Sequence, residues 1–107
     1  MRAYGILFRE VVDRQGEKIL VAGADIKGLV GAPVRSSFND LEMFNYLGRI
    51  EHVYPVLTEE EARAKGDEDW KLWFLAGAPF VKVDVRWLNT DMGRYTDLLV
   101  RNEPTFF

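Results

Sequence analysis

The sequence feature that most constrains the fold is the alternation of residues between Phe80 and Leu88. Every second side chain is apolar, and those between are charged. A period of two is typical of a β-strand with one face in the core and one in solvent. The apolar face would comprise Val81, Val83, Val85 and Trp87, and the wet face Lys82, Asp84 and Arg86. We therefore expect Val83→Ala to cost about 1–3 kcal/mol and Lys82→Ala well under 1 kcal/mol.

Several other runs are also predicted to be strands. They are rich in β-branched or aromatic residues and are bounded by glycine, proline or polar turns. The predicted strands are residues 1–13, 18–26, 49–57, 71–76, 80–88 and 95–101. Residues 14–17 suit a hairpin turn between the first two strands. Pro55 lacks an N–H group, which favours a sheet edge or a bulge at that position.

Two segments carry helix signals. Ser37 is a suitable N-cap for a run with apolar residues at helical spacing, and Gly48 suits its C-terminal end. The spaced apolar residues are Phe38, Leu41, Phe44 and Leu47. Thr58 and Glu61 form a capping-box pattern for a second, short helix, which Gly66 and the acidic residues 67–69 would end.

The tally of elements predicts the fold class. A chain of 107 residues forms one domain, spanning residues 1–107. Strands outnumber helices, and a small sheet must cover or close its edges. We expect an α+β domain built as a small antiparallel β-barrel with one flanking helix.

The sequence offers little chemistry. It has no cysteine and one histidine, His52, so neither a thiolate site nor a histidine-rich metal site is expected. No phosphate-binding loop is present. A pairing of Asp84 with Asp91 or Asp97 for a divalent ion is a minor alternative to plain surface roles. We predict no catalytic residue, metal or cofactor, and no enzymatic activity.

Charge and hydropathy restrict the partners. The net charge is −3, and residues 59–69 are strongly acidic, whereas nucleic-acid binding domains usually carry a basic excess. Nucleic acid is therefore an unfavoured partner. No apolar run reaches the about 20 residues of a membrane helix, and no signal peptide opens the chain. We expect a cytoplasmic protein without a membrane role.

The tail is the candidate partner-binding segment. Pro104, Phe106 and Phe107 lie outside any periodic element. Pro104 favours an extended backbone just before it. The two phenylalanines either fold back over a sheet edge or stay exposed for a protein partner or a second copy of the chain. We expect them to contact a partner.

Two segments of the C-terminal third carry a family resemblance: Phe-Leu-Ala-Gly-Ala-Pro-Phe-Val at 74–81 and Tyr-Thr-Asp-Leu-Leu-Val-Arg at 95–101. They resemble the corresponding part of RNA polymerase subunit 8, a small barrel related to the OB fold. The resemblance implies that residues 95–101 close the sheet as a strand. It also implies a role as an assembly subunit of a polymerase.

In size and composition the chain also resembles the first type of arcadin. Arcadins are small archaeal proteins encoded with an actin-like filament protein, crenactin. The lack of cysteine and the richness in Arg, Glu and Val suit a thermophilic archaeal source. This resemblance implies a non-enzymatic accessory protein of an archaeal actin-like cytoskeleton, which is our first expectation. A polymerase subunit and an OB-type single-stranded nucleic-acid binder are the alternatives.

Overall fold

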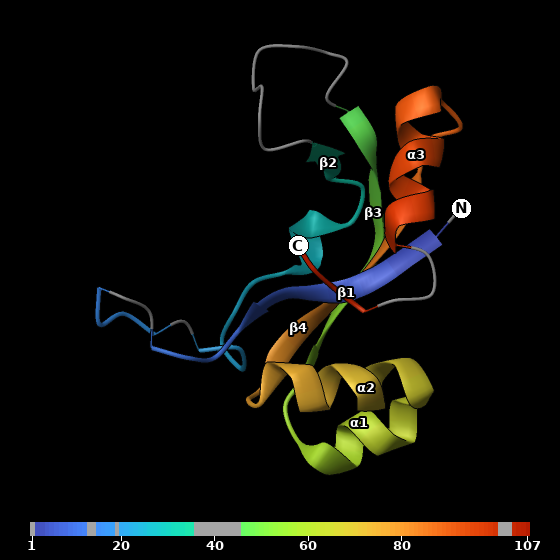
Figure 1. The fold of residues 1–107 in the computed structure, drawn as a ribbon. Coiled ribbons are helices and arrows are strands. Elements are labelled where there is room, and N and C mark those ends of the chain that lie inside the picture. Colours follow the sequence, from blue (N-terminus) through green and yellow to red (C-terminus); the bar gives the residue numbers. More distant parts are fainter. Residues whose placement is uncertain (1, 13–14, 19, 36–45, 101–103) are drawn as a thin grey trace.

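The computed structural model describes residues 2–12, 15–18, 20–35, 46–100 and 104–107. These residues form a mixed β-sheet with helices on both faces (Figure 1). In chain order the elements are β1 (Arg2–Arg9), the 3₁₀ helix η1 (Lys27–Leu29), β2 (Pro33–Arg35), β3 (Tyr46–Val56), α1 (Glu59–Lys65), α2 (Asp67–Ala76), β4 (Phe80–Trp87), α3 (Asp91–Val100) and β5 (Thr105–Phe106).

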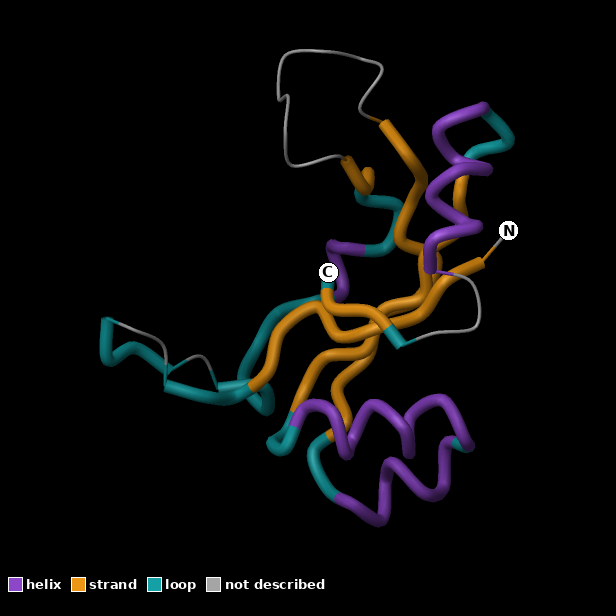
Figure 2. Tube along the Cα trace, in the orientation of Figure 1, coloured by secondary structure: helices purple, strands orange, loops and turns teal. Residues whose placement is uncertain are grey.

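The sheet has the strand order β2-β3-β4-β1-β5. All neighbours are antiparallel except β1 and β5, which run parallel. The sheet curves like half of a barrel but stays open, with β2 and β5 at its two edges (Figure 2). The α+β class is therefore confirmed. The predicted barrel is seen only as a barrel-like open sheet, and it is mixed and not wholly antiparallel, because β5 runs parallel to β1. The prediction of one flanking helix is wrong, because three α-helices cover the sheet in the described part of the chain.

The central strand β4 is buried on both faces. On one face, here called the α2 face, Phe80 packs with residues of β1 and β3 and with the helices α1 and α2. This core contains Tyr4, Ile6, Val56, Ala62, Leu72, Ala76 and Phe80. On the opposite face, here called the α3 face, the valines of β4 pack with Trp87, with Leu29 of η1 and with Val100 of α3. The predicted apolar face is thus confirmed.

The two predicted strands beside β4 are helices instead. Residues 71–76 belong to α2 and residues 95–100 belong to α3. In α2, Asp69, Leu72 and Ala76 are buried at helical spacing, and the run from Trp70 to Ala76 has no β-branched residue. Gly77 adopts the left-handed conformation with φ 63°, and its N–H bonds to the Trp73 carbonyl. Gly77 therefore ends a helix and does not join two strands.

The predicted strand at 18–26 is also absent. The described residues 20–26 form no strand, and a single bridge joins Val12 to Lys18. The apolar residues of this run serve the core in another way, since Val21 and Ile26 are buried against Val81 on the α3 face. Burial alone does not distinguish a strand from a packed loop.

The predicted helix at 37–47 is corrected at its C-terminal end. Leu47 and Gly48 lie in β3, while Ser37, Phe38, Leu41 and Phe44 lie outside the described residues. Gly48 is opposite Trp87 in the register, and a Cβ atom there would lie 2.4 Å from the Arg86 carbonyl oxygen. This glycine permits close approach of two strands and is not a helix cap.

The short helix α1 has the predicted start. The Glu61 N–H donates to Thr58 Oγ1 at 3.2 Å, and Glu61 Oε2 accepts from the Leu57 N–H at 2.8 Å. The two bonds confirm the capping pattern. The second bond comes from the N–H of Leu57, one residue before the N-cap Thr58. Pro55 lies in the half of β3 that β2 does not reach, so its missing N–H breaks no ladder there.

Gly48→Ala is expected to destabilise the chain by about 1–3 kcal/mol, because the new methyl group must push two hydrogen-bonded strands apart. Denaturant unfolding monitored by circular dichroism measures the change. Gly28→Ala is the control, since a Cβ at Gly28 meets no atom within 4 Å. Equal midpoints for the two variants would contradict the close strand approach.

Candidate functional site

The charged face of β4 forms a buried ionic cluster. Lys82 is only 4% exposed, and its Nζ lies 2.9 Å from Asp69 Oδ1 and 3.1 Å from Glu68 Oε1. Both acids come from the first turn of α2. Tyr54 of β3 donates its hydroxyl to Asp69 at 2.7 Å. The prediction that Lys82 lies in solvent is therefore wrong, because α2 covers this face of the sheet.

A second cation completes the cluster. The Arg2 guanidinium binds both carboxylate oxygens of Glu68, at 2.7 and 2.8 Å, and also contacts Asp84. Asp84 is buried, and its second oxygen lies 3.5 Å from Nδ1 of the exposed His52. The cluster thus ties β1, β3 and β4 to α2 through charge-assisted hydrogen bonds.

The shifted pKa values of Glu68, Lys82 and Tyr54 fix the ionisation states of the cluster near neutral pH. The hydrogen bonds from Arg2 lower the pKa of Glu68 to about 2. Burial acts to lower the pKa of Lys82, but its bonds to Asp69, Tyr54 and Glu68 outweigh burial and raise it. Burial, and then the bond to Asp69, raises the pKa of Tyr54 to about 12. These three groups neither take up nor release protons near neutral pH, so the cluster is suited to holding α2 on the sheet.

The minor hypothesis of a carboxylate pair for a divalent ion gains no support. Asp84 is engaged by Arg2 and Lys82, and Asp91 pairs with Arg94 one turn along α3. Asp97 is buried on the inner side of α3. Within the described ranges, no group of three His, Asp or Glu side chains is arranged to hold a metal ion.

Lys82→Ala is expected to destabilise the chain by about 3–5 kcal/mol, because it leaves the buried Asp69 without its cation. Val83→Ala should cost about 1–3 kcal/mol. Arg86→Ala on the same strand is the control. Its guanidinium is exposed and pairs only with Glu51 at the surface, so the cost should stay under about 1 kcal/mol. Urea unfolding measures all three, and a Lys82 variant as stable as the Arg86 variant would contradict the buried cluster.

Glu68→Gln tests the pH dependence. Since the pKa of Glu68 is lowered from 4.5 to about 2, its contribution is complete above about pH 5 and is lost as pH falls toward 2. The difference in melting temperature between wild type and Glu68→Gln should therefore shrink over that interval. Glu60→Gln, an exposed residue in α1, is the control. A difference that stays constant from pH 7 to about 2 would contradict the assignment.

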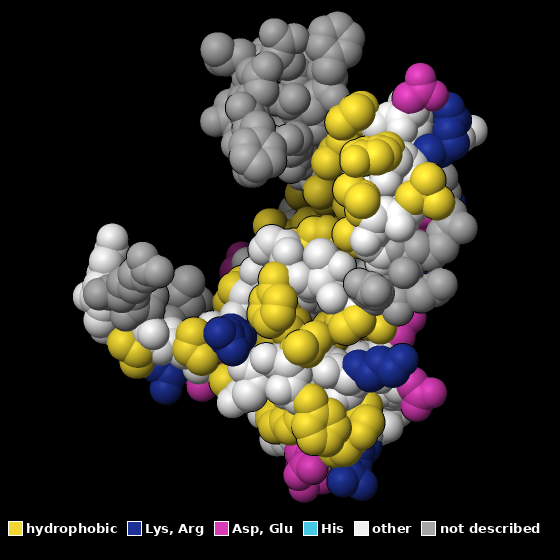
Figure 3. Space-filling model, in the orientation of Figure 1, with side chains coloured by type: hydrophobic (Ala, Val, Ile, Leu, Met, Phe, Trp, Pro, Cys, Tyr) yellow, Lys and Arg dark blue, Asp and Glu magenta, His cyan; other side chains and the backbone are white. Residues whose placement is uncertain are grey.

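The helix α3 turns its apolar side outward. Met92, Tyr95, Leu98 and Leu99 are 49, 58, 69 and 62% exposed, respectively. The side that packs on the sheet carries Gly93, Asp97 and Val100. Apolar side chains gather along α3 in the space-filling view (Figure 3). A surface helix normally buries its apolar stripe, so the outward orientation of α3 leaves an unusual exposed apolar surface.

Local bonds hold α3 in this orientation. The Thr90 hydroxyl accepts from the Gly93 N–H at 3.1 Å and so caps the first turn. Asp97 is 2% exposed in the last turns. Rotating the helix to bury its leucines would bring Asp97 into solvent and take Gly93 off the sheet. The outward apolar stripe is therefore a property of the packed helix.

The tail folds back along the sheet edge. Thr105 and Phe106 form β5 beside β1, and Pro104 is half-buried just before them. Phe106 is 53% exposed, and the Arg9 guanidinium carbon lies 5.7 Å from the centre of its ring. Phe107 is 37% exposed, with its ring 6.3 Å from that of Trp87. The edge-covering alternative thus describes where the tail lies, and its partner-binding role stays a prediction.

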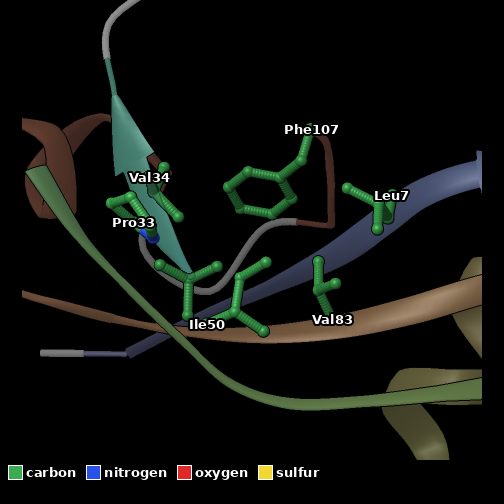
Figure 4. A pocket seen from close by; sticks show the side chains of 7 residues that line it. Leu7, Pro33, Val34, Ile50, Val83 and Phe107 are labelled. Carbon is green, nitrogen blue, oxygen red and sulfur yellow. The ribbon is translucent and has the colours of Figure 1, made fainter. Parts of the chain in front are cut away.

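An apolar pocket of about 310 Å³ lies beside the tail (Figure 4). Its walls come from four strands and from the ring of Phe107. The lining residues are Leu7, Pro33, Val34, Ile50, Val83, Val85 and Phe107. Trp87 belongs to the same apolar cluster, and its Nε1 is the one buried side-chain polar atom without a hydrogen-bond partner in the described residues.

Sequence reasoning missed the α3 surface. The strand prediction for residues 95–101 overlooks the helical spacing of Met92, Tyr95 and Leu99, which recur at i, i+3 and i+7. Asn89-Thr90-Asp91 carried a usable signal, because threonine before an acidic first turn is typical of a helix start. The tail, in contrast, stands out in the sequence, and its partner-binding role stays a prediction.

Comparison with family models, with curated proteins and with solved structures found no match. Among the described residues, no helix is both long and apolar enough to span a bilayer. The resemblances to subunit 8 and to the arcadins therefore stay predictions.

Proposed function

We propose that the chain is a non-enzymatic protein-interaction module that presents α3 to a partner protein. The observation that carries the proposal is the outward apolar stripe of Met92, Tyr95, Leu98 and Leu99. Each such side chain gains about 1.5–3 kcal/mol when it leaves water, and the ordering cost of association offsets part of that sum. The stripe is thus large enough to drive a specific contact.

The spacing indicates the kind of partner surface. Met92, Tyr95 and Leu99 stand at i, i+3 and i+7, which is the pattern by which a helix anchors in an apolar groove. The Asp91–Arg94 ion pair lies at the N-terminal end of the stripe and supplies a polar rim. We infer a partner that offers an apolar groove about two helical turns long.

The charged cluster supports a role without catalysis. Lys82 and Glu68 are ordinary catalytic residue types, yet each is engaged by opposite charge and holds its proton state near neutral pH. They are explained by the attachment of α2 to the sheet. The proposal of no enzymatic activity rests on this engagement and on the sparse set of reactive residues in the sequence.

The finer assignment is an accessory protein of an archaeal actin-like cytoskeleton in the cytoplasm, supported by size and composition. A polymerase subunit of the subunit-8 type is the second candidate. Its support is weaker, because the segment that would close that barrel, residues 95–100, is helical here. An OB-type nucleic-acid binder is the third, and the net charge of −3 disfavours it.

Leu99→Glu is expected to abolish the partner contact, because a carboxylate cannot enter an apolar groove unpaired. Affinity purification from the native cell, with wild type and variant compared quantitatively, measures the effect. Partner recovery should fall by about tenfold or more, as for loss of a central anchor. The recovered proteins also separate an actin-like filament from a polymerase.

Leu20→Glu is the matched control, since Leu20 is 60% exposed but lies far along the chain from α3. It should recover the same proteins as wild type. Circular dichroism checks that both variants fold. Recovery that is insensitive to Leu99→Glu, or equally reduced by Leu20→Glu, would overturn the assignment of α3 as the contact.

A further inference from the structure

The tail is attached to the sheet by few interactions. β5 has two residues, paired as Gly5 with Thr105 and Ile6 with Phe106, and the Phe107 N–H donates to the Ile6 carbonyl at 2.8 Å. The phenylalanine rings are about half and one-third exposed. A segment held by so few bonds can leave its site at a modest cost in free energy.

The edge of β1 is shaped to receive a second backbone at Gly5. A Cβ atom there would lie 1.9 Å from the Thr105 carbonyl oxygen and 2.7 Å from the Phe107 ring. The three atoms nearest to that Cβ position all belong to the tail. The absence of a side chain at Gly5 therefore allows the tail to lie against β1, as is usual where two backbones approach closely.

The last side chain of the tail, Phe107, lines the apolar pocket. Phe107 points over a cavity whose floor is formed by Ile50 and Val83 (Figure 4). The cavity keeps about 310 Å³ beside the ring, so the tail does not fill it. The preceding ring, Phe106, instead stacks near Arg9. Phe106 and Phe107 therefore point to opposite sides of the tail, the first toward Arg9 and the second toward the apolar pocket. Successive side chains of any extended segment alternate in this way.

We propose that the β1 edge and this pocket form a binding site for an extended segment of a partner protein with two adjacent aromatic residues. The chain's own tail, residues 104–107, occupies the site in cis. Main-chain bonds to β1 supply affinity, and Arg9 and the pocket select the two rings. The site is separate from α3 and does not depend on the function proposed for that helix.

Occupation in cis sets the conditions for binding. A tethered tail competes at an effective concentration in the millimolar range, so a free peptide binds the full chain poorly. Removal of residues 104–107 should free the site. The natural probe is the peptide Asn-Glu-Pro-Thr-Phe-Phe, which repeats residues 102–107, with Asn-Glu-Pro-Thr-Ala-Ala as its control.

Calorimetric titration of the truncated chain with these peptides tests the proposal. The Phe-Phe peptide should bind the truncated chain at least about tenfold more tightly than it binds the full chain, and about tenfold more tightly than the Ala-Ala peptide binds. Binding should change the fluorescence of Trp87, whose ring lies near that of Phe107, and Trp87→Phe should remove the change. Equal binding of both peptides, or no binding by a folded truncated chain, would overturn the proposal.

Gly5→Ala in the truncated chain is the sharpest variant. With the tail gone, the atoms nearest to the new methyl group are gone too, so the variant should fold as the truncated chain does and yet bind no peptide. Unimpaired binding would contradict strand addition at this edge. Leu99→Glu should leave peptide binding unchanged, which separates failure here from failure of the α3 proposal.

Two further outcomes are decisive. If the truncated chain does not fold, the full chain with Phe107→Ala replaces it, since β5 keeps its backbone but loses its pocket anchor. That variant should bind the Phe-Phe peptide more tightly than wild type, and equal binding overturns the proposal. If the full chain forms dimers that truncation dissolves, as measured by sedimentation, the edge belongs to a second copy and the partner-segment proposal fails.

Discussion

The rest of the structure depends on the burial of one ammonium group, that of Lys82. Moving such a charge out of water costs several kcal/mol unless opposite charges and hydrogen bonds replace the water. Asp69, Glu68 and Tyr54 supply this replacement, and Arg2 compensates the surplus of negative charge. The first turn of α2 must therefore sit over the middle of β4, which makes β4 a strand covered on both faces.

The two helical layers both bury an acidic residue but differ in where their leucines lie. On the α2 face, acidic residues of a helix turn inward because a buried cation is there to meet them. On the α3 face, Asp97 also turns inward, while the leucines of that helix turn outward. The sheet thus buries Leu72 and Ala76 of α2, although Phe74 and Leu75 stay exposed, and it leaves the apolar side of α3 uncovered. The α2 layer stabilises the domain, and the α3 layer is the one we propose for partner contact.

Sequence patterns predicted the parts of this fold that depend on local rules. The strand β4 with its apolar face, the strand at 49–57 and the capping pair Thr58–Glu61 follow from side-chain period and backbone bonding over a few residues, and the structure confirms them. The solvent-facing side predicted for β4 is wrong, because α2 covers it. The same local rules predict strands for residues 71–76 and 95–101, where the described residues are helical. They cannot distinguish the two elements there, because short runs of Leu, Trp and Tyr suit either a helix or a strand.

The candidate sites were harder to predict for a different reason. Burial of Lys82 depends on α2, whereas the sequence predicts a strand at residues 71–76 and a helix end at residues 67–69, so no predicted helix places Glu68 and Asp69 over the sheet. The outward stripe of α3 likewise requires the helical spacing. The tail stood out because Phe106 and Phe107 follow a proline and belong to no period, although its pairing with Gly5 joins residues 100 apart.

The position of β1 has a consequence for how fast the domain folds. Its neighbours in the sheet are β4 and β5, so all its strand partners are separated from it by most of the chain. β3, α1, α2 and β4 are, in contrast, consecutive in sequence and contact one another. Closing a long loop costs conformational entropy before any contact repays it. Folding should therefore start in the β3–β4 unit and be limited by the late docking of β1, at a rate typical of sheets with distant pairings and not of local helical bundles.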